Sequence, residues 1–116
     1  MNIEACYNKM GADYAEVKSR LPSDAFIKRF ALKFLDDPTF ALLEKNLSEE
    51  NVDEAFRAAH TLKGITQNLG FSQLSPLAIE ITEILRAGTM DGVDSLFPQL
   101  KEKYDMTVAC IKEVDE

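Results

Sequence analysis

The sequence has little of what several protein classes require. Histidine occurs once, and the two cysteines, Cys6 and Cys110, lie near opposite ends of the chain. Zinc sites and dithiol redox motifs need closely spaced ligands or thiols, so neither is predicted. We expect both cysteines to be buried or idle thiols, and we predict no metal and no cofactor.

Long apolar stretches and an excess of basic residues are also absent. No segment approaches the roughly 18 to 20 uncharged apolar residues that a membrane-spanning helix needs. Residues 1–11 alternate polar and apolar side chains, unlike a secretory signal. We therefore expect a cytoplasmic protein without membrane contact. The 20 acidic residues outnumber the 13 basic ones, and a formal charge of −7 argues against nucleic acid as a partner.

Sustained alternation of apolar and polar residues is missing as well, which excludes half-buried strands. Apolar residues instead recur at spacings of three and four almost throughout, so the predicted class is all-α. With 116 residues, of which 46% are apolar, the chain is expected to form one domain over residues 1–116. Nothing in the sequence demands more than a monomer.

Glycine and proline fall mostly between the periodic segments and predict the helix boundaries. Short helices are expected over about residues 2–10 and from 13 or 14 to 21. Four longer amphipathic helices with short connections then indicate an antiparallel four-helix bundle, with the smaller N-terminal segments beside it. The expected starts of the later helices are Ser23, Asp37-Pro38, Asn51, Ser72 and about Val93.

The helix that begins at Asn51 carries the single histidine. Asn51 and Glu54 resemble a capping box, and the helix is expected to run to Asn68, with Gly70 just beyond it. At about 100° per residue, His60 lies roughly 160° from the centre of the apolar side, so its imidazole is predicted to face solvent. That apolar side consists of Ala55, Ala59, Leu62, Thr66 and Leu69.

Three residues that follow His60 on the exposed side favour phosphate chemistry. An exposed, neutral imidazole can attack an activated phosphoryl group. Lys63, one turn on, is placed to offset the charge of the phosphoryl oxygens. Gly64 costs roughly 1 kcal/mol relative to alanine in a helix interior, and its missing side chain lets another protein close over the imidazole. Gln67 can add a hydrogen bond to the phosphoryl group or to the partner.

Phe56 and Arg57 precede His60 by one turn. A large aromatic side chain on the exposed flank either contacts a neighbouring element of the same domain or forms a docking surface. Both interpretations of Phe56 stay open from the sequence, and we take Phe56 and Arg57 as candidate partner-docking residues.

The stretch Ala59-His60-Thr61-Leu62-Lys63-Gly64, followed by Asn68-Leu69-Gly70, resembles the signature of histidine-containing phosphotransfer domains. That family carries H-x-x-K-G on a helix and a second glycine ten residues after the histidine, here Gly70. The resemblance extends upstream over residues 30–38 and downstream over residues 77–88. One departure is Ile65, where many relatives have a small serine or alanine.

This resemblance implies a four-helix bundle that carries phosphate between receiver domains without binding ATP or phosphorylating itself. It implies His60 as phosphoacceptor, Lys63 as phosphate stabiliser and Gly64 as the clearance position. Consistent with this, no Walker-type loop and no kinase motif set is present, so the phosphoryl group must arrive already activated. The expected partners are receiver domains of a hybrid sensor kinase, a response regulator, or both. The chain is thus expected to be a phosphoryl carrier in a two-component phosphorelay and not an enzyme.

Three other functions were considered. A helical adaptor could have the same fold and bind receiver domains through Phe56 without carrying phosphate. A di-iron bundle needs inward-facing histidines and carboxylates, which one histidine cannot supply. Hydrolytic catalysis lacks a serine or cysteine paired with His60 and an acidic residue to orient it.

Overall fold

The computed structural model describes residues 1–115, which form seven α-helices and no strand. Every helix in this range is too short or too polar to cross a lipid bilayer. The predicted all-α class is confirmed. In chain order the helices are α1 (Ile3–Lys9), α2 (Tyr14–Arg20), α3 (Asp24–Phe34), α4 (Thr39–Ser48), α5 (Val52–Asn68), α6 (Ser75–Arg86) and α7 (Val93–Lys112).

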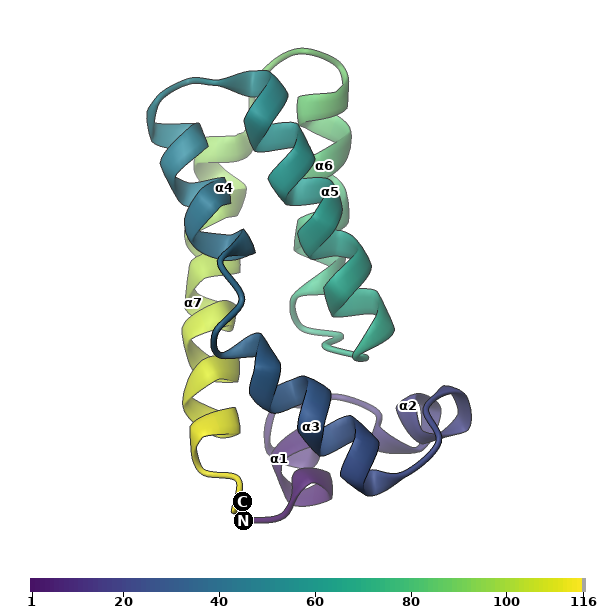
Figure 1. Ribbon diagram of the computed structural model, residues 1–116. Coiled ribbons are helices and arrows are strands. Elements are labelled where there is room, and N and C mark those ends of the chain that lie inside the picture. Colours follow the sequence, from purple (N-terminus) through teal and green to yellow (C-terminus); the bar gives the residue numbers. More distant parts are fainter. Residues whose placement is uncertain (116) are drawn as a thin grey trace.

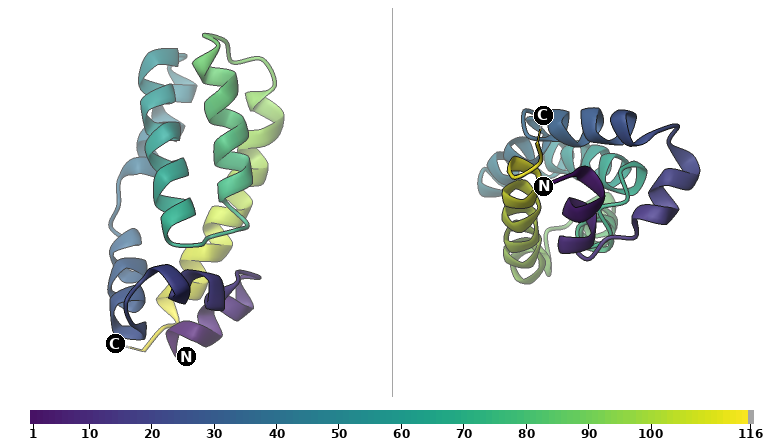
Figure 2. Two further views of the ribbon diagram at one scale, coloured as in Figure 1. Left: turned by 90° about the vertical axis from the view of Figure 1, so that its right-hand side faces the viewer. Right: turned by 90° about the horizontal axis from the view of Figure 1, so that it is seen from below.

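The helices α4 to α7 run side by side as the predicted bundle (Figures 1 and 2). Within it, α5 packs most closely against α4 and α6. The buried side of α5 is rich in alanine, with Ala55, Ala58 and Ala59 almost fully enclosed. Small side chains let neighbouring helix backbones approach closely, which fixes α5 from two sides.

A seam of aromatic rings joins α7 to α4. The rings of Phe40 and Tyr104 stack with their centroids 3.9 Å apart, and Phe97 lies 5.5 Å from Phe40 on a nearly parallel plane. Each such ring buries a large apolar area, so this seam replaces the close backbone packing seen around α5. The first and last helices of the bundle are thereby held together.

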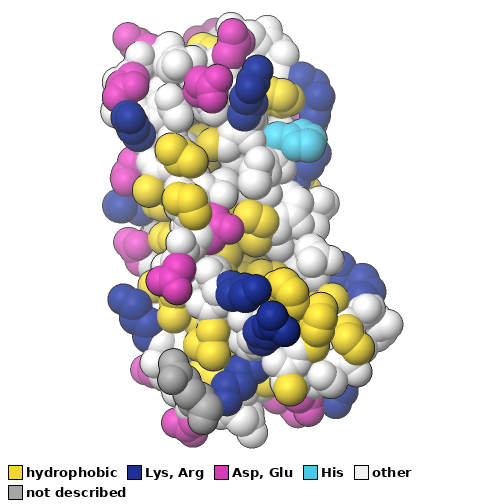
Figure 3. Space-filling view, viewed as in Figure 1, with side chains coloured by type: hydrophobic (Ala, Val, Ile, Leu, Met, Phe, Trp, Pro, Cys, Tyr) yellow, Lys and Arg dark blue, Asp and Glu magenta, His cyan; other side chains and the backbone are white. Residues whose placement is uncertain are grey.

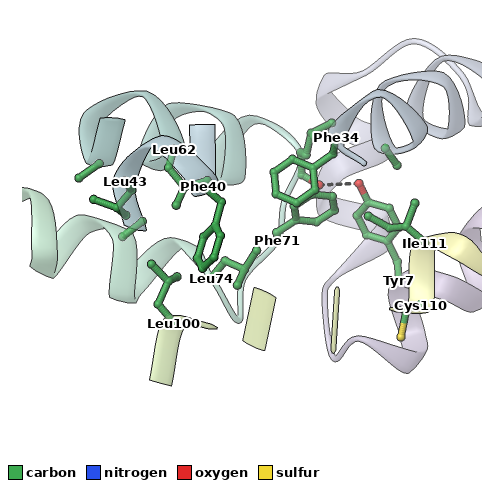
Figure 4. Packing of buried hydrophobic residues seen from close by; sticks show 14 of the residues in the cluster. Tyr7, Phe34, Phe40, Leu43, Leu62, Phe71, Leu74, Leu100, Cys110 and Ile111 are labelled. Atoms are coloured by element: carbon green, nitrogen blue, oxygen red, sulfur yellow. Dashed lines mark hydrogen bonds between the residues drawn. The ribbon is translucent and has the colours of Figure 1, made fainter. Parts of the chain in front are cut away.

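The N-terminal helices α1, α2 and α3 lie across one end of the bundle, where α5 ends (Figure 1). Tyr7 on α1 is fully enclosed, and its ring lies 5.7 Å from that of Phe71. Phe34 on α3 meets Phe71 from another side, at 5.1 Å (Figure 4). One hydrophobic cluster therefore runs from Ile3 to Val114 and includes both the bundle and its N-terminal helices.

The predicted helix caps are confirmed at two starts and wrong at a third. The side chains of Ser23 and Asn51 accept hydrogen bonds from the amides three residues on, at 3.1 and 3.2 Å. Ser72, predicted to cap the next helix, caps nothing, because α6 begins only at Ser75 without a side-chain cap. Phe71 is buried and its carbonyl accepts the amides of both Leu74 and Ser75, so a backbone-bonded turn occupies the predicted first turn.

Both cysteines are buried and unpaired with each other, as predicted. Burial raises the pKa of the Cys6 thiol to about 11. Because the thiolate is the reactive form of cysteine, Cys6 stays protonated and unreactive at neutral pH.

Candidate functional site

The helix α5 provides a rigid support for the histidine. Asn51 accepts the Glu54 amide through its side chain, as the capping-box pattern predicts, and Asp53 and Glu54 place negative charge at the positive end of the helix dipole. The predicted apolar side of α5 is the buried one, including Leu62, which is 1% exposed. The exposed side therefore has a fixed direction relative to the bundle.

His60 lies on that exposed side, as predicted (Figure 3). Its ring has one aromatic neighbour, Phe56, with the two centroids 5.8 Å apart. The ion pairs of residues 1–115 do not include His60. The imidazole is thus accessible to a reactant from outside and is not held by a carboxylate of this part of the chain.

The three residues predicted to follow His60 on the surface differ in their surroundings. Lys63 is half-buried, and the ion pairs found within residues 1–115 do not use its ammonium. A Cβ atom added to Gly64 meets no atom of the described residues within 4 Å. Gln67 has an exposed side chain, while its backbone carbonyl accepts a hydrogen bond from Arg20 at 3.1 Å. An unpaired cation and an open gap therefore lie within about one turn of His60.

Phe56 is half-buried and packs against the core, which gives it a contact inside the fold. The guanidinium of Arg86, on α6, lies 5.0 Å from the centre of the Phe56 ring and forms a cation–π contact with it. Arg86, Phe56 and His60 thus form a continuous series of neighbours from α6 to α5. The fully exposed Arg57 pairs only loosely with Glu54, at 3.8 Å.

A hollow of about 410 Å³ lies beside this series, lined by residues of α5, α6 and the following loop. It contains two guanidinium groups, from Arg57 and Arg86, and one carboxylate, from Asp53. Sequence reasoning missed Arg86, because a helical wheel of α5 says nothing about which residue of α6 reaches the same surface. Arg86 could be predicted only from the register in which α6 pairs with α5.

Ile65, the departure from the family pattern, is half-buried and packs against the core. It also lines a groove of about 220 Å³ together with Phe30 and Lys33 of α3. No group of three or more histidine, cysteine, aspartate or glutamate side chains in residues 1–115 is placed to hold a metal ion.

Comparison with known proteins finds similarity to a known family. A family model described as the Hpt domain matches residues 37–109, which include α4, α5 and α6 and most of α7. The chemotaxis protein CheA of Halobacterium salinarum is 36% identical over 70 residues. That alignment covers 58% of this chain and 10% of CheA, so the chain spans about a tenth of that relative's length. No solved structure matches the chain.

The Hpt family acts in phosphotransfer in two-component and chemotaxis signalling, together with receiver domains and kinases, and its domains carry phosphate instead of acting as kinases. The matched residues exceed half of the chain and contain His60, Lys63 and Gly64. The helices α1 to α3 precede the matched residues. The chain belongs to the Hpt domain family.

Proposed function

We propose that His60 accepts a phosphoryl group from the aspartyl phosphate of a receiver domain and passes it to a second receiver domain. An imidazole nitrogen forms a bond to phosphorus while the bond from phosphorus to the aspartyl oxygen breaks, and the carboxylate leaves as an anion. The reverse step loads the second receiver. The observation that carries this proposal is the exposed imidazole on the rigid α5, next to the open space at Gly64.

Lys63 and Gln67 are proposed to stabilise the phosphorylated histidine. The ammonium of Lys63 is one turn from His60 and free of the ion pairs within residues 1–115, so it can turn toward phosphoryl oxygens. The exposed amide of Gln67 lies about two turns on and can donate a further hydrogen bond. Gly64 leaves room for the receiver's active site, because transfer between two proteins depends on the positioning of the reacting atoms, and a misplacement of about 1 Å can cost on the order of 100-fold in rate.

Phe56 and Arg57 are proposed to contact the receiver on the other side of His60. Arg86 contacts the ring of Phe56 and adds a second guanidinium to the hollow that Arg57 lines. Two guanidinium groups favour an acidic or phosphate-bearing partner surface. The proposed partners are receiver domains of a hybrid sensor kinase, a response regulator, or both, with residues 1–116 acting as a single carrier domain.

The test is phosphotransfer from a panel of receiver domains that have been phosphorylated with acetyl phosphate and Mg²⁺. We expect acid-labile, base-stable phosphate on the wild-type chain and none on His60→Gln. Because the chain contains one histidine, this single substitution removes every possible phosphohistidine. Binding of a receiver without transfer to the wild type would favour the adaptor function instead.

Lys63 has a matched control in the same experiment. Lys63→Gln is expected to slow transfer and to shorten the lifetime of the phosphohistidine, because the phosphoryl charge loses its nearest cation. Lys45→Gln removes the same charge from an exposed position on α4 and is expected to leave both rates unchanged. Equal rates for Lys63→Gln and the wild type would remove Lys63 from the proposed site.

A further inference from the structure

A second cationic surface lies on α3, outside the residues that the family model matches. Residues 25–35 contain three cations, Lys28, Arg29 and Lys33, and no carboxylate, although the chain as a whole carries a formal charge of −7. None of these three cations takes part in the ion pairs of residues 1–115. Positive charge is therefore concentrated on one short helix of an acidic protein.

Aromatic rings lie among these cations. Phe26 and Phe30 are half-buried and adjacent, with their ring centroids 4.5 Å apart. Lys33 lies 5.1 Å and Arg29 5.9 Å from the centre of the Phe30 ring. Because Arg29 and Lys33 contact the half-buried ring of Phe30 and take part in none of the ion pairs of residues 1–115, the patch combines apolar area with positive charge. We call Phe26, Arg29, Phe30, Lys33 and the adjoining Ile65 of α5 the α3 surface.

The α3 surface is continuous with the exposed side of α5. A groove of about 220 Å³ between the two helices is lined by Phe30 and Lys33 from α3, by Ile65 and Asn68 from α5, and by Asp37. His60, Gly64 and Asn68 follow one another at four-residue spacing and are all exposed. This row spans about 12 Å along the helix axis and passes over the open space at Gly64.

Figure 3 shows the histidine and the mixed basic and apolar cluster on the same face of the molecule. A domain seated over His60 that extends along α5 past Gly64 therefore reaches the groove without meeting a side chain of this chain at position 64. Continuity of the two surfaces favours one partner for both. The unpaired cations favour an acidic segment in that partner.

We infer that the α3 surface binds an acidic, partly apolar segment of the same receiver domain that exchanges phosphate with His60, and that Arg29 and Lys33 select among receivers by charge. This inference rests on the proposed function. The selection acts on encounter and binding, because both cations belong to α3, and Lys33 lines the groove with Ile65 and Asn68 and not with His60. Receivers with a neutral or basic surface at this position are disfavoured.

The experiment measures transfer rates at increasing concentrations of the receiver that labels the wild-type chain fastest. Arg29→Glu with Lys33→Glu is expected to raise KM on the order of tenfold or more at low salt and to leave kcat unchanged. The KM of the wild type should rise with salt more steeply than that of the double variant. Lys112→Glu, on the exposed side of α7, is the matched charge control and should behave like the wild type.

Direct phosphorylation by phosphoramidate separates this inference from the proposed function. The wild type, the double variant and Lys112→Glu should be labelled equally by this small donor, because it needs no docking surface. A wild-type chain that accepts phosphate from phosphoramidate but from no receiver contradicts the proposed function. Transfer from a receiver with the same KM in wild type and double variant overturns the α3 surface alone, and sedimentation of the wild type with anionic vesicles in that case would assign the surface to a membrane.

Discussion

The two glycines of the motif lie six residues apart and have opposite relations to the fold. Gly70 has a φ of +70°, and a Cβ atom there would lie 2.0 Å from Cγ2 of Val17. Gly64 is inside α5 in ordinary helical conformation, and a Cβ atom there meets no atom of residues 1–115 within 4 Å. The backbone conformation and the packing therefore explain why residue 70 is a glycine, but they do not explain why residue 64 is one.

The backbone around each glycine shows the same contrast. At the C-terminal end of α5, the amides of Gly70 and Phe71 bond to the carbonyls of Gln67 and Thr66, in the pattern of a Schellman motif. Of the N-terminal helices, α1 contributes Tyr7, which donates to a further carbonyl, that of Leu69, and α2 contributes Arg20, which makes a second hydrogen bond to the carbonyl of Gln67. The chain thus satisfies one end of α5 itself and leaves the middle of its exposed side uncovered. A surface left open at a cost in stability indicates a partner from outside.

The largest effect is expected from Gly70→Ala. The side chain would both strain the left-handed backbone and overlap Val17, which should lower the free energy of unfolding by about 2 to 5 kcal/mol. Urea denaturation followed by circular dichroism measures this change. In a double-mutant cycle with Val17→Ala, the combined loss should be smaller than the sum of the two separate losses. Additive losses would show that Val17 and residue 70 do not interact.

Tyr7→Phe tests the end of α5 without adding atoms. The hydroxyl of Tyr7 donates to the buried carbonyl of Leu69 at 2.6 Å, so its removal leaves that acceptor unsatisfied and should cost about 1 to 3 kcal/mol. The same unfolding experiment measures it. Rates of phosphoryl transfer at His60 should stay unchanged at temperatures where the variant is folded. A large loss of transfer in a fully folded variant would contradict the separation of the two regions.

Gly64→Ala should raise the free energy of unfolding, whereas Gly70→Ala and Tyr7→Phe lower it. Alanine is better than glycine in a helix interior by about 1 kcal/mol, and no atom of the described residues obstructs its methyl group, so the variant should unfold at a higher urea concentration than the wild type. Transfer from a receiver should nevertheless fall by on the order of tenfold or more, because the methyl group shifts the two active sites apart. Labelling by phosphoramidate should be unaffected. A variant that is less stable than the wild type would reveal an internal role for Gly64.

The sequence predicts which residues of α5 are exposed or buried, but it does not predict the contacts between helices that distinguish the two glycines. The exposure of His60 and the burial of Leu62 follow from helical periodicity, which is a property of α5 alone. The close approach of Val17 to Gly70 depends on how α2 packs against the end of α5, and the position of Arg86 depends on the register between α6 and α5. No local pattern records these distances.

The error at Ser72 has the same origin. Its residue type suits a helix cap, but the burial of Phe71 against Tyr7 and Phe34 fixes a turn before α6. The sequence did not predict the α3 surface. The periodicity of α3 predicts which of its residues are buried, but it does not predict whether its cations form ion pairs with other helices. Caps and surfaces are thus decided by contacts between helices that lie far apart in the sequence.

The smallest expected effect on stability is that of Asp24→Asn. Asp24 connects α3 to α2, two of the helices that lie at the C-terminal end of α5. The hydroxyl of Tyr14 donates to Asp24 at 2.5 Å, and Lys18 lies 3.1 Å away, so both hold the pKa of this carboxyl below its usual range. Because the folded-state pKa is the lower one, the stabilisation is present above the pKa of the unfolded state and is lost as pH falls through that of the folded state. Asp24→Asn should therefore unfold at a slightly lower urea concentration than the wild type near pH 7, and the difference should shrink below about pH 4. A difference that stays constant down to pH 2.5 would mean that the charge of Asp24 does not contribute, and that the amide disturbs packing instead.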